Sequence, residues 1–355
     1  PLKEEIDAAV IAILNDQTFR TAPVCERFES KMARFAGVKH GLGVSTGTDA
    51  ILLMLKAAGI QHGDEVITTP FTFFATAGAI VNAGAKPVFV DIEPDTLNID
   101  PALIEAAITE KTKAIIAVHI FGQCADMDPI LALGKKHNLP VFEDCAQALG
   151  AKYKGRDACS MGLGGSISFY PTKNLGAAGE GGLILTNDDT LAEEVKKHRC
   201  HGMVGTYMHD LVGTNSHLNA MQAAVLEVKL PHLPAWNDAR RAIAAQYNAA
   251  FADCPGITLP VERDESYHVY HQYVPRVKNR DAVLELLRSK DIACGVYYPL
   301  SLHQQECFKS WVDADTSCPE SELACKEVLA LPIYPELTQA QIQEVIDGVK
   351  EALAL

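Results

Sequence analysis

The segment GSISFYPTKNLGAAGEGG, residues 165–182, decides the expected fold and centres on Lys173. A β-rich run at 166–170 leads into this single lysine, and glycines stand on both sides of Glu180. The pattern predicts a lysine at the end of a buried strand, on a turn with little side-chain bulk around it. An amine in that setting is desolvated, loses its proton near neutral pH and attacks carbonyl groups. Taken alone, the segment also fits an ordinary surface lysine in a loop.

Apolar strands and amphipathic helices alternate through the first two-thirds of the chain. The expected strands cover residues 41–45, 64–70, 85–92, 112–120, 139–145, 166–170 and 181–187. The helices between them are expected at 48–58, 72–83 and 128–137. This alternation predicts an α/β fold with a mostly parallel seven-stranded sheet that is covered on both faces. Ligands of such sheets bind beyond the carboxyl ends of the strands, so the loops that follow strands are expected to carry the chemistry.

A long helical pattern marks the end of the expected large domain. It begins near Asn219, breaks at Pro231 and Pro234, and resumes at 237–251. Prolines at such a point are typical of a kink between domains. We expect a large domain at 1–235, which includes an N-terminal helix, and a smaller α+β domain at 236–355.

Composition and charge narrow the classes of partner. The formal net charge of −14 is expected to repel nucleic acid and anionic membranes. The ten cysteines include no CxxC pair and no cluster with histidine at zinc-site spacing, so no metal site is expected. The N-terminal segment is interpreted as an acidic amphipathic helix rather than a signal peptide, and no apolar run approaches membrane-spanning length. We therefore expect a cytoplasmic protein with reduced thiols, in which Cys145 is a small core residue rather than a nucleophile.

Two of the loops that follow strands suggest a phosphate and a flat ring. In the first, Thr46 to Asp49 open a helix, whose free N–H groups and threonine hydroxyls can hold a phosphate. A simple helix cap is the alternative. The second loop places Phe73 and Phe74 after a strand, so that one ring can stack on a cofactor while the other packs in the core.

Two further loops add an acid and the lysine. In VFEDCAQALG (141–150), Asp144 can bind a protonated ring nitrogen and Gln147 a ring oxygen, although a helix N-cap is equally compatible. The loop with Lys173 also offers the hydroxyl of Ser168. Together the four loops require a ligand with a phosphate, a flat ring, a basic ring nitrogen and a carbonyl. Pyridoxal 5′-phosphate (PLP) has all four features.

The chain resembles the DegT/DnrJ/EryC1/StrS aminotransferases, which act on nucleotide-linked keto-sugars and related cyclitols. The resemblance extends from about Val24 through the C-terminal helices. The motifs that carry it are STGTDA (45–50), PFTFFAT (70–76), FGQCADMD (121–128), EDCAQALGA (143–151), SFYPTKN (168–174), GEGG (179–182), GTNSHLNAMQAA (213–224) and YYPLSLH (297–303).

The resemblance implies a fold-type I (aspartate aminotransferase-like) homodimer with active sites at the subunit interface. It also implies roles for eight residues around PLP. Lys173 forms the internal aldimine, Asp144 pairs with the pyridine nitrogen, Gln147 lies near the ring hydroxyl, Phe73 stacks on the ring, Thr48, the Asp49 amide and Ser168 bind the phosphate, and Asn215 reaches the phosphate in the neighbouring subunit.

Two positions depart from the pattern of the family. His217 stands where arginine is common, which leaves its substrate contact open. His303 falls near the active-site histidine of the family, but Ser301 and Leu302 extend the usual PLH motif. Both histidines are candidate substrate contacts, and a purely structural role is the alternative for each.

The reaction that the resemblance implies is a ping-pong transamination from L-glutamate to a keto-sugar. The FGQCADMD and NSHL stretches are most similar to members that aminate C3 of a dTDP- or UDP-linked 3-keto-hexose. Amination at C4 and amination of a cyclitol ketone such as an inosose remain alternatives. A sugar dehydratase would have histidine at position 173, and a non-enzymatic regulator would bind PLP without needing the lysine.

Overall fold

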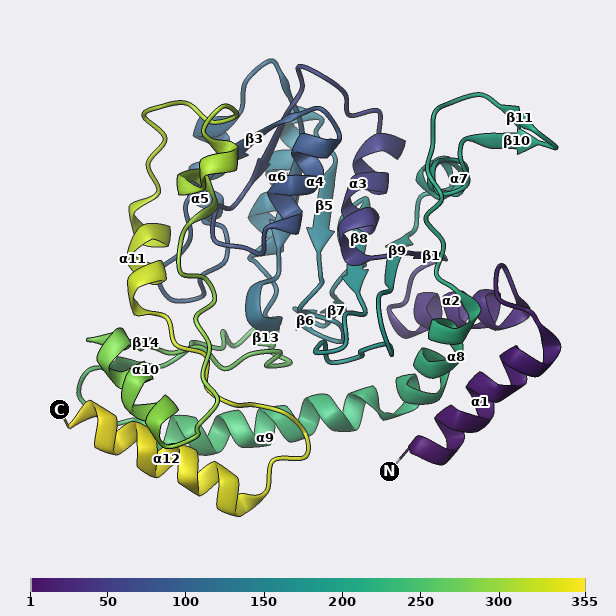
Figure 1. Cartoon of the computed structure of the whole chain (residues 1–355). Helices are drawn as coiled ribbons and strands as arrows, with labels where there is room; N and C mark the ends of the chain where they lie inside the picture. The colour runs from purple at the N-terminus through teal and green to yellow at the C-terminus, as the bar shows by residue number, and fades with distance from the viewer. Residues whose placement is uncertain (1, 355) are drawn as a thin grey trace.

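The computed structural model describes residues 2–354, and its centre is a seven-stranded sheet (Figure 1). The strand order is β1-β9-β8-β5-β4-β2-β3. The strands are β1 (His40–Val44), β2 (Glu65–Thr68), β3 (Lys86–Phe89), β4 (Thr112–Val118), β5 (Val141–Asp144), β8 (Gly164–Ser168) and β9 (Gly182–Thr186). Neighbouring strands are parallel from β8 to β3, whereas β9 is antiparallel to both β8 and β1. The predicted mostly parallel sheet is confirmed.

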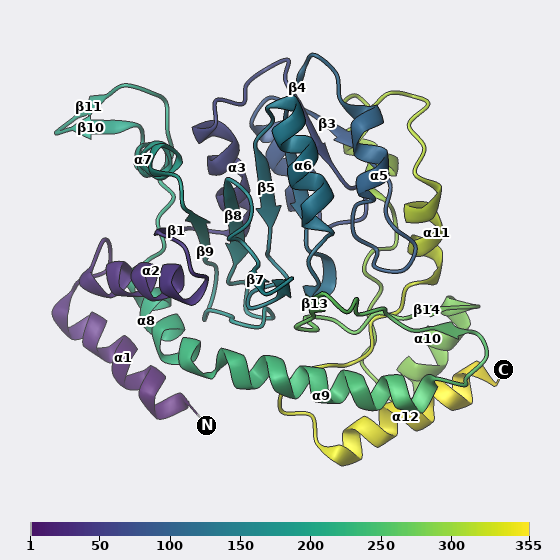
Figure 2. The same ribbon diagram turned by 180° about the vertical axis from the view of Figure 1, so that it is seen from behind.

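Helices cover both faces of this sheet (Figures 1 and 2). The hydrophobic cluster on one face includes α3 (Gly47–Ala57), α4 (Ala75–Asn82) and α7 (Asp189–His198), and the cluster on the other includes α2 (Pro23–Phe35) and α6 (Met127–His137). Strand β4 supplies both clusters, because Ile115 faces one and Ile116 the other. A strand buried on both faces is apolar throughout, which explains why these strands were readable from the sequence.

A kinked helical pair runs beneath the carboxyl ends of the strands (Figure 1). Helix α8 (Ala220–Lys229) leads through the 3₁₀ turn η3 (Leu230–His232) into α9 (Leu233–Phe251). Pro231 lies in the 3₁₀ turn and Pro234 in the first turn of α9, where a missing N–H costs little. The chain therefore bends where the prolines predicted a break.

The C-terminal part has its own hydrophobic cluster, around Tyr247, Phe251 and Tyr273. It contains α10 (Arg280–Ser289), α11 (Pro319–Glu327), α12 (Gln339–Leu353), β12 (Ile257–Thr258) and β14 (Arg276–Val277). Leu233 at the start of α9 belongs to the large-domain cluster, whereas the end of α9 packs in the C-terminal one. One continuous helix thus crosses position 235, and the boundary placed there stays a prediction.

The remaining elements are short or peripheral. They are α1 (Lys3–Asp16), α5 (Pro101–Ile104), η1 (Glu105–Ala107), η2 (Ile120–Gly122), η4 (Leu302–Gln304), η5 (Glu306–Phe308), the hairpin β10 (Met203–Gly205) and β11 (Met208–His209), and a small sheet of β13 (Ser266–Tyr267), β6 (Lys152–Tyr153) and β7 (Arg156–Asp157). The β10–β11 hairpin projects from the body in both views (Figures 1 and 2). Among residues 2–354, no helix has the length and apolar character needed to cross a bilayer.

Arg240 joins α9 to the C-terminal part. Its Nη1 donates hydrogen bonds to the carbonyl oxygens of Tyr270 (3.3 Å), His271 (3.2 Å) and Ile333 (2.8 Å). Burial lowers the pKa of the Arg240 guanidinium to about 10, and Glu336 opposes that shift. The side chain is only 6% exposed, so its removal leaves three carbonyls without donors in a region that water does not reach.

We predict that Arg240→Met lowers the free energy of unfolding by about 3 kcal/mol, because unpaired buried carbonyls are costly. Urea unfolding followed by circular dichroism measures the change. Lys278→Met is the matched control, since Lys278 is exposed, and it is expected to change stability little. Equal stability of the two variants would contradict a structural role for the Arg240 hydrogen bonds.

Candidate active site

Lys173 lies in the turn that follows β8. Its backbone N–H donates to the Tyr170 carbonyl at 2.9 Å, and the neighbouring Phe169 and Leu175 are buried and anchor the turn. Burial of the amine lowers the pKa of Lys173 to about 8, and the Asp144 carboxylate partly opposes that shift. The neutral fraction at pH 7 is therefore roughly two to three orders of magnitude larger than for a free lysine.

Asp144 ends the neighbouring parallel strand β5 and is only 5% exposed. Its Oδ2 accepts a hydrogen bond from the Thr76 hydroxyl at 2.8 Å, and its Oδ1 accepts one from the Ala146 N–H at 3.1 Å. Thr72 in turn lies 3.0 Å from the Thr76 hydroxyl. Each carboxylate oxygen keeps a lone pair, which a protonated ring nitrogen can use. Sequence reasoning missed Thr76, although its four-residue spacing from Thr72 was a usable signal.

Gln147 is held by two partners close to Asp144. Its Oε1 accepts a hydrogen bond from the Phe121 N–H at 2.6 Å, and its Nε2 donates to the Tyr298 hydroxyl at 3.1 Å. Burial raises the pKa of Tyr298, which therefore stays protonated. Tyr298 lies in the YYPLSLH motif, yet the sequence alone gave no reason to place it beside Gln147.

The first turn of α3 lies at the same end of the sheet. Thr46 caps this helix, because its hydroxyl accepts the Asp49 N–H at 3.0 Å. The Asp49 amide thus already has a partner, and the Asp49 carboxylate accepts the Ser216 hydroxyl at 2.9 Å. No hydrogen bond of the Thr48 hydroxyl is found within residues 2–354, so that group is open to a ligand.

Two glycines bring this turn close to the sheet. A Cβ atom on Gly47 would lie 2.7 Å from the Cβ of Ser168, and one on Gly182 would lie 2.2 Å from the Thr46 carbonyl oxygen. Both distances are shorter than real side-chain contacts. The glycines therefore allow the start of α3 to approach the end of β8, which forms a cradle of helix N–H groups and hydroxyls that suits a phosphate.

The two phenylalanines of the second loop differ in their surroundings. Phe74 packs on Phe308 with ring centroids 5.2 Å apart, whereas Phe73 is 59% exposed. Phe73 is thus the ring that is free to stack on a ligand, in the manner that the sequence predicted for one of the pair.

The loop with Asn215 and His217 reaches the same region through Ser216, which links it to Asp49. Asn215 is exposed and His217 half-buried. Burial, with smaller contributions from Arg199 and Arg20, lowers the pKa of His217 to about 4, and its buried Nε2 has no partner among the described residues. His217 is therefore neutral at pH 7 and does not replace the charge of an arginine.

His303 has no free ring nitrogen. Its Nδ1 lies 2.9 Å from the Ser301 hydroxyl and its Nε2 3.0 Å from Glu322. The residue is buried, next to the Phe89 ring, and it does not line the cleft that contains Lys173. Its role as a substrate contact stays a prediction.

A cleft of about 1110 Å³ opens between the Lys173 turn, α9 and the C-terminal part. Its lining carries one carboxylate, Glu336, and four cations: Lys3, Lys173, Lys229 and Arg240. In a chain with a net charge of −14, this local positive charge favours an anionic ligand.

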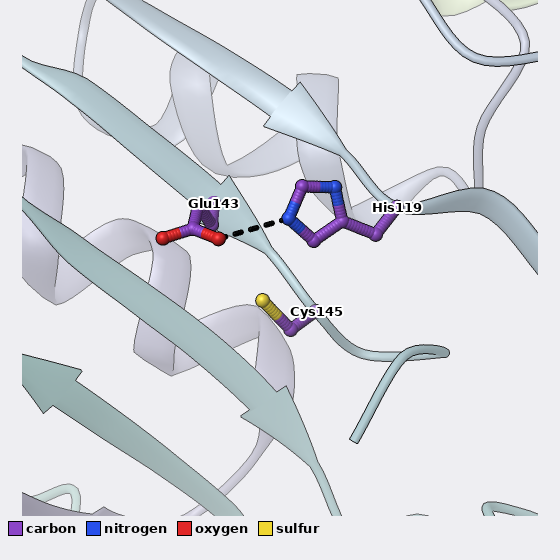
Figure 3. Close-up of side chains that lie close together, drawn as sticks. All are labelled: His119, Glu143 and Cys145. Atoms are coloured by element: carbon purple, nitrogen blue, oxygen red, sulfur yellow. Dashed lines mark hydrogen bonds and ion pairs between the residues drawn. The ribbon is translucent and has the colours of Figure 1, made fainter. Parts of the chain in front are cut away.

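His119, Glu143 and Cys145 form a buried group beside Asp144 that has the residue types of a metal site (Figure 3). His119 Nδ1 accepts the Ala125 N–H at 3.1 Å, so its Nε2 carries the proton and donates to Glu143 at 2.9 Å. The backbone N–H groups of Cys159, Met161 and Gly162 also donate hydrogen bonds to the Glu143 carboxylate oxygens. Burial keeps Cys145 a thiol by raising its pKa. The group joins strand ends, and both the His119 nitrogens and the Glu143 oxygens are already used in hydrogen bonds.

Lys173 follows β8, and the buried Asp144 ends the neighbouring parallel strand β5. This placement in a mostly parallel sheet defines a class of enzymes. The class is that of the fold-type I enzymes, which use PLP. Residues 1–350 match the DegT/DnrJ/EryC1/StrS aminotransferase family, and the chain belongs to that family. The predicted fold class, PLP dependence and aminotransferase activity are confirmed.

Three known proteins illustrate the likeness. A "pleiotropic regulatory protein" of Geobacillus stearothermophilus is 49% identical over 99% of this chain and 95% of its own. A UDP-N-acetyl-3-dehydro-alpha-D-glucosamine 3-aminotransferase of Acidithiobacillus ferrooxidans is 44% identical, with the same shares covered. The crystal structure of Streptomyces venezuelae DesV in complex with a ketimine intermediate has a TM-score of 0.97 and 39% identity, over 100% of this chain and 95% of that one.

We predict that Gly47→Ala weakens the binding of PLP at least tenfold, because the new methyl group pushes the start of α3 away from Ser168. Titration of the apoprotein with PLP, followed by absorbance, measures the dissociation constant. Gly205→Ala serves as the control, since its added Cβ meets nothing closer than 3.9 Å. Similar affinities for both variants would argue against a phosphate cradle at Gly47.

Proposed function

We propose that this chain transfers the amino group of L-glutamate to C3 of a nucleotide-linked 3-keto-hexose, with PLP held at Lys173. The observation that carries the proposal is the half-buried Lys173, whose amine is desolvated to a pKa of about 8, near the buried carboxylate of Asp144. A lysine with a lowered pKa acts both as a nucleophile toward the cofactor and as a proton carrier during transfer.

The residues of the proposed site fit PLP. When bound, PLP supplies an electron-accepting ring that stabilises negative charge on the carbon next to the amine. Asp144 holds the proton on the ring nitrogen, since Thr76 keeps its carboxylate in place. Gln147 would bind the ring oxygen, and the exposed Phe73 would stack on the ring. Thr48, Ser168 and the amide end of α3 hold the phosphate, where the Asp49 amide must exchange its Thr46 partner for a phosphate oxygen.

Lys173 has two tasks in this proposal. Its amine would hold the cofactor through the carbonyl group until an amino donor binds. A neutral amine at this position would also take the proton from the Cα of the donor and then give it up, which is general base and general acid catalysis in turn. The lowered pKa places this exchange near neutral pH.

The sugar substrate is proposed from relatives and from charge. Several relatives between 40% and 44% identical are named as acting on UDP- or dTDP-linked sugars, and their names place the oxo or amino group at C3. The cleft at Lys173 carries Lys3 and Lys229 as further cations, which suits an anionic substrate, although Asp144 and Gln147 do not line it. We expect the UDP-linked ketone to be the better substrate, because the relative at 44% is named for one.

A regulatory role without catalysis is the second candidate, since one relative at 49% is named a pleiotropic regulatory protein. Binding of PLP alone needs no lysine with a lowered pKa, which favours the enzyme. The lysine also argues against a sugar dehydratase, whereas a cyclitol ketone differs only in substrate and stays an alternative.

We also propose a homodimer in which Asn215 of one subunit reaches the cofactor phosphate of the other. The β10–β11 hairpin and the segment after it present large apolar side chains to solvent, with Tyr207 89% and Val212 93% exposed. Exposed apolar groups that gather on one projecting element are typical of an interface. Asn215 follows that segment directly and is exposed as well.

The transfer is tested in two half-reactions. L-Glutamate is expected to convert the bound cofactor to its pyridoxamine form, and the UDP-linked 3-keto-hexose to restore the starting absorbance. A 4-keto isomer and an inosose are compared at the same concentrations. Faster reoxidation by either of these would overturn the C3 assignment.

The variant Lys173→Ala tests the proposed role of the lysine directly. We expect it to fold and to lose the absorbance of the lysine-bound cofactor, together with turnover by at least about 10³-fold, because no other amine replaces it. A variant that keeps near wild-type turnover would refute the role of Lys173.

The dimer is tested at its projecting segment. We predict that Tyr207→Asp combined with Val212→Asp converts a dimer into monomers, because two buried carboxylates oppose association. Analytical ultracentrifugation measures the mass, and Leu103→Asp, at a side chain 45% exposed on α5, is the control. A double variant that remains dimeric would place the interface elsewhere.

A further inference from the structure

The residue after the lysine, Asn174, is buried and held by a polar network. Its Nδ2 donates to the Asn237 Oδ1 at 2.8 Å and to the Val269 carbonyl at 3.2 Å. Its Oδ1 lies 3.1 Å from the Nδ1 of His271. All three side chains are buried, at 9% exposure or less. The network therefore ties the Lys173 turn both to α9 and to the segment at 269–271.

Backbone carbonyls fix the direction of every hydrogen bond in this network. Asn237 Nδ2 donates to the Leu149 carbonyl at 3.1 Å, so Asn237 must turn its Oδ1 toward Asn174. Asn174 likewise must direct its Nδ2 at the Val269 carbonyl, which leaves only its Oδ1 for His271. An amide oxygen accepts, so His271 Nδ1 carries the proton. A neutral His271 therefore has its lone pair on Nε2.

The surroundings of His271 keep it neutral. Burial, then the charges of Lys173 and Arg240, hold the pKa of His271 well below its ordinary value. The charged groups near it on neighbouring elements are thus Lys173 on the turn and Arg240 on α9, with Asp144 beyond the lysine and Glu336 acting on Arg240. His271 and Lys173 line the same cleft.

The network also reaches the strand end that carries the acid. Leu149 belongs to the loop after β5, which holds Asp144 and Gln147. Gly150 makes this contact possible, because its φ is +87° and a Cβ there would lie 2.8 Å from Asn237 Nδ2. The chain of hydrogen bonds from Leu149 to His271 thus connects the acid-bearing loop with the lysine-bearing turn.

We propose that Asn237, Asn174 and His271 are positioning residues for Lys173, which fix its turn against the Asp144 loop. The inference rests on the proposed function, because positioning Lys173 matters for the reaction only if Lys173 binds PLP. Asn174 acts through the backbone it shares with Lys173. His271 acts as the donor that completes Asn174, since without that donor the buried Asn174 oxygen has no partner.

The test uses the rate at which the apoprotein attaches added PLP covalently, measured against pH. Only a neutral amine attacks the aldehyde, so the midpoint of this profile reports the proton affinity of Lys173. In the wild type the rate is expected to rise with a midpoint near pH 8, the pKa that burial gives Lys173. Asn174→Ala releases and hydrates the turn, so its midpoint is expected to rise by about one pH unit, a tenfold change in proton affinity.

Two substitutions of His271 separate the hydrogen bond from the ring. His271→Asn keeps an N–H donor near the Nδ1 position and is expected to retain the wild-type midpoint. His271→Gln places its amide near the Nε2 position, loses the donor to Asn174 and is expected to shift like Asn174→Ala. Asn82→Ala, at an exposed residue on α4, is the control.

The outcomes separate this inference from the proposed function. Wild-type protein that never attaches PLP at Lys173 would overturn the proposed function. Attachment with one midpoint for wild type, Asn174→Ala and both His271 variants would overturn only the positioning role. ¹⁵N NMR of histidine-labelled wild type, assigned with His271→Asn, tests the network without relying on a variant's stability: a proton on Nδ1 is expected, and one on Nε2 would overturn it.

Discussion

The structure depends on one constraint, which is that a desolvated amine must stay near a buried carboxylate without forming a tight pair with it. Asp144 ends β5, and Lys173 lies in the turn that follows the adjacent parallel strand β8. The carboxylate has two donors of its own, Thr76 and the Ala146 amide, and the amine is shifted mainly by burial. Both groups are therefore free to interact with a ligand between them. A direct ion pair would have protonated the lysine firmly and blocked the acid.

Buried polar groups around this pair limit its movement. The carboxylate of Glu143, next to Asp144, accepts hydrogen bonds from His119 and from the segment at 159–162. These bonds hold the end of β5 in place. On the other side, Asn174 and Asn237 hold the turn that carries Lys173. Polar groups with every partner supplied make such sites rigid, and rigid placement is what proton transfer between fixed atoms requires.

Sequence reasoning predicted the sheet, the family and the residues that follow strands, because these depend on local patterns. Strands buried on both faces are apolar throughout, and loops at their carboxyl ends are read directly from the chain. It missed Tyr298, Asn237 and His271, since each reaches the site from a segment distant in the sequence, and it missed Thr76 although that residue lies in a loop it had singled out. Placing the Asp49 amide on a phosphate also overlooked Thr46, whose hydroxyl already accepts it. The individual roles of the predicted site residues and the domain boundary stay predictions.

Some relatives are named for regulation and others for catalysis. The free energy that the folded protein loses by lowering the pKa of Lys173 helps to decide between a regulator and an enzyme. Lowering the pKa of Lys173 from 10.5 to about 8 costs the folded protein on the order of 3 kcal/mol at a pH where the free amine is charged. That is a large fraction of the stability of an ordinary domain. A protein that only binds PLP gains nothing from this cost, because a phosphate cradle and a stacking ring hold the cofactor without it. A lysine whose pKa is shifted at such a cost is typical of catalytic sites. The lowered pKa of Lys173 therefore favours an enzyme.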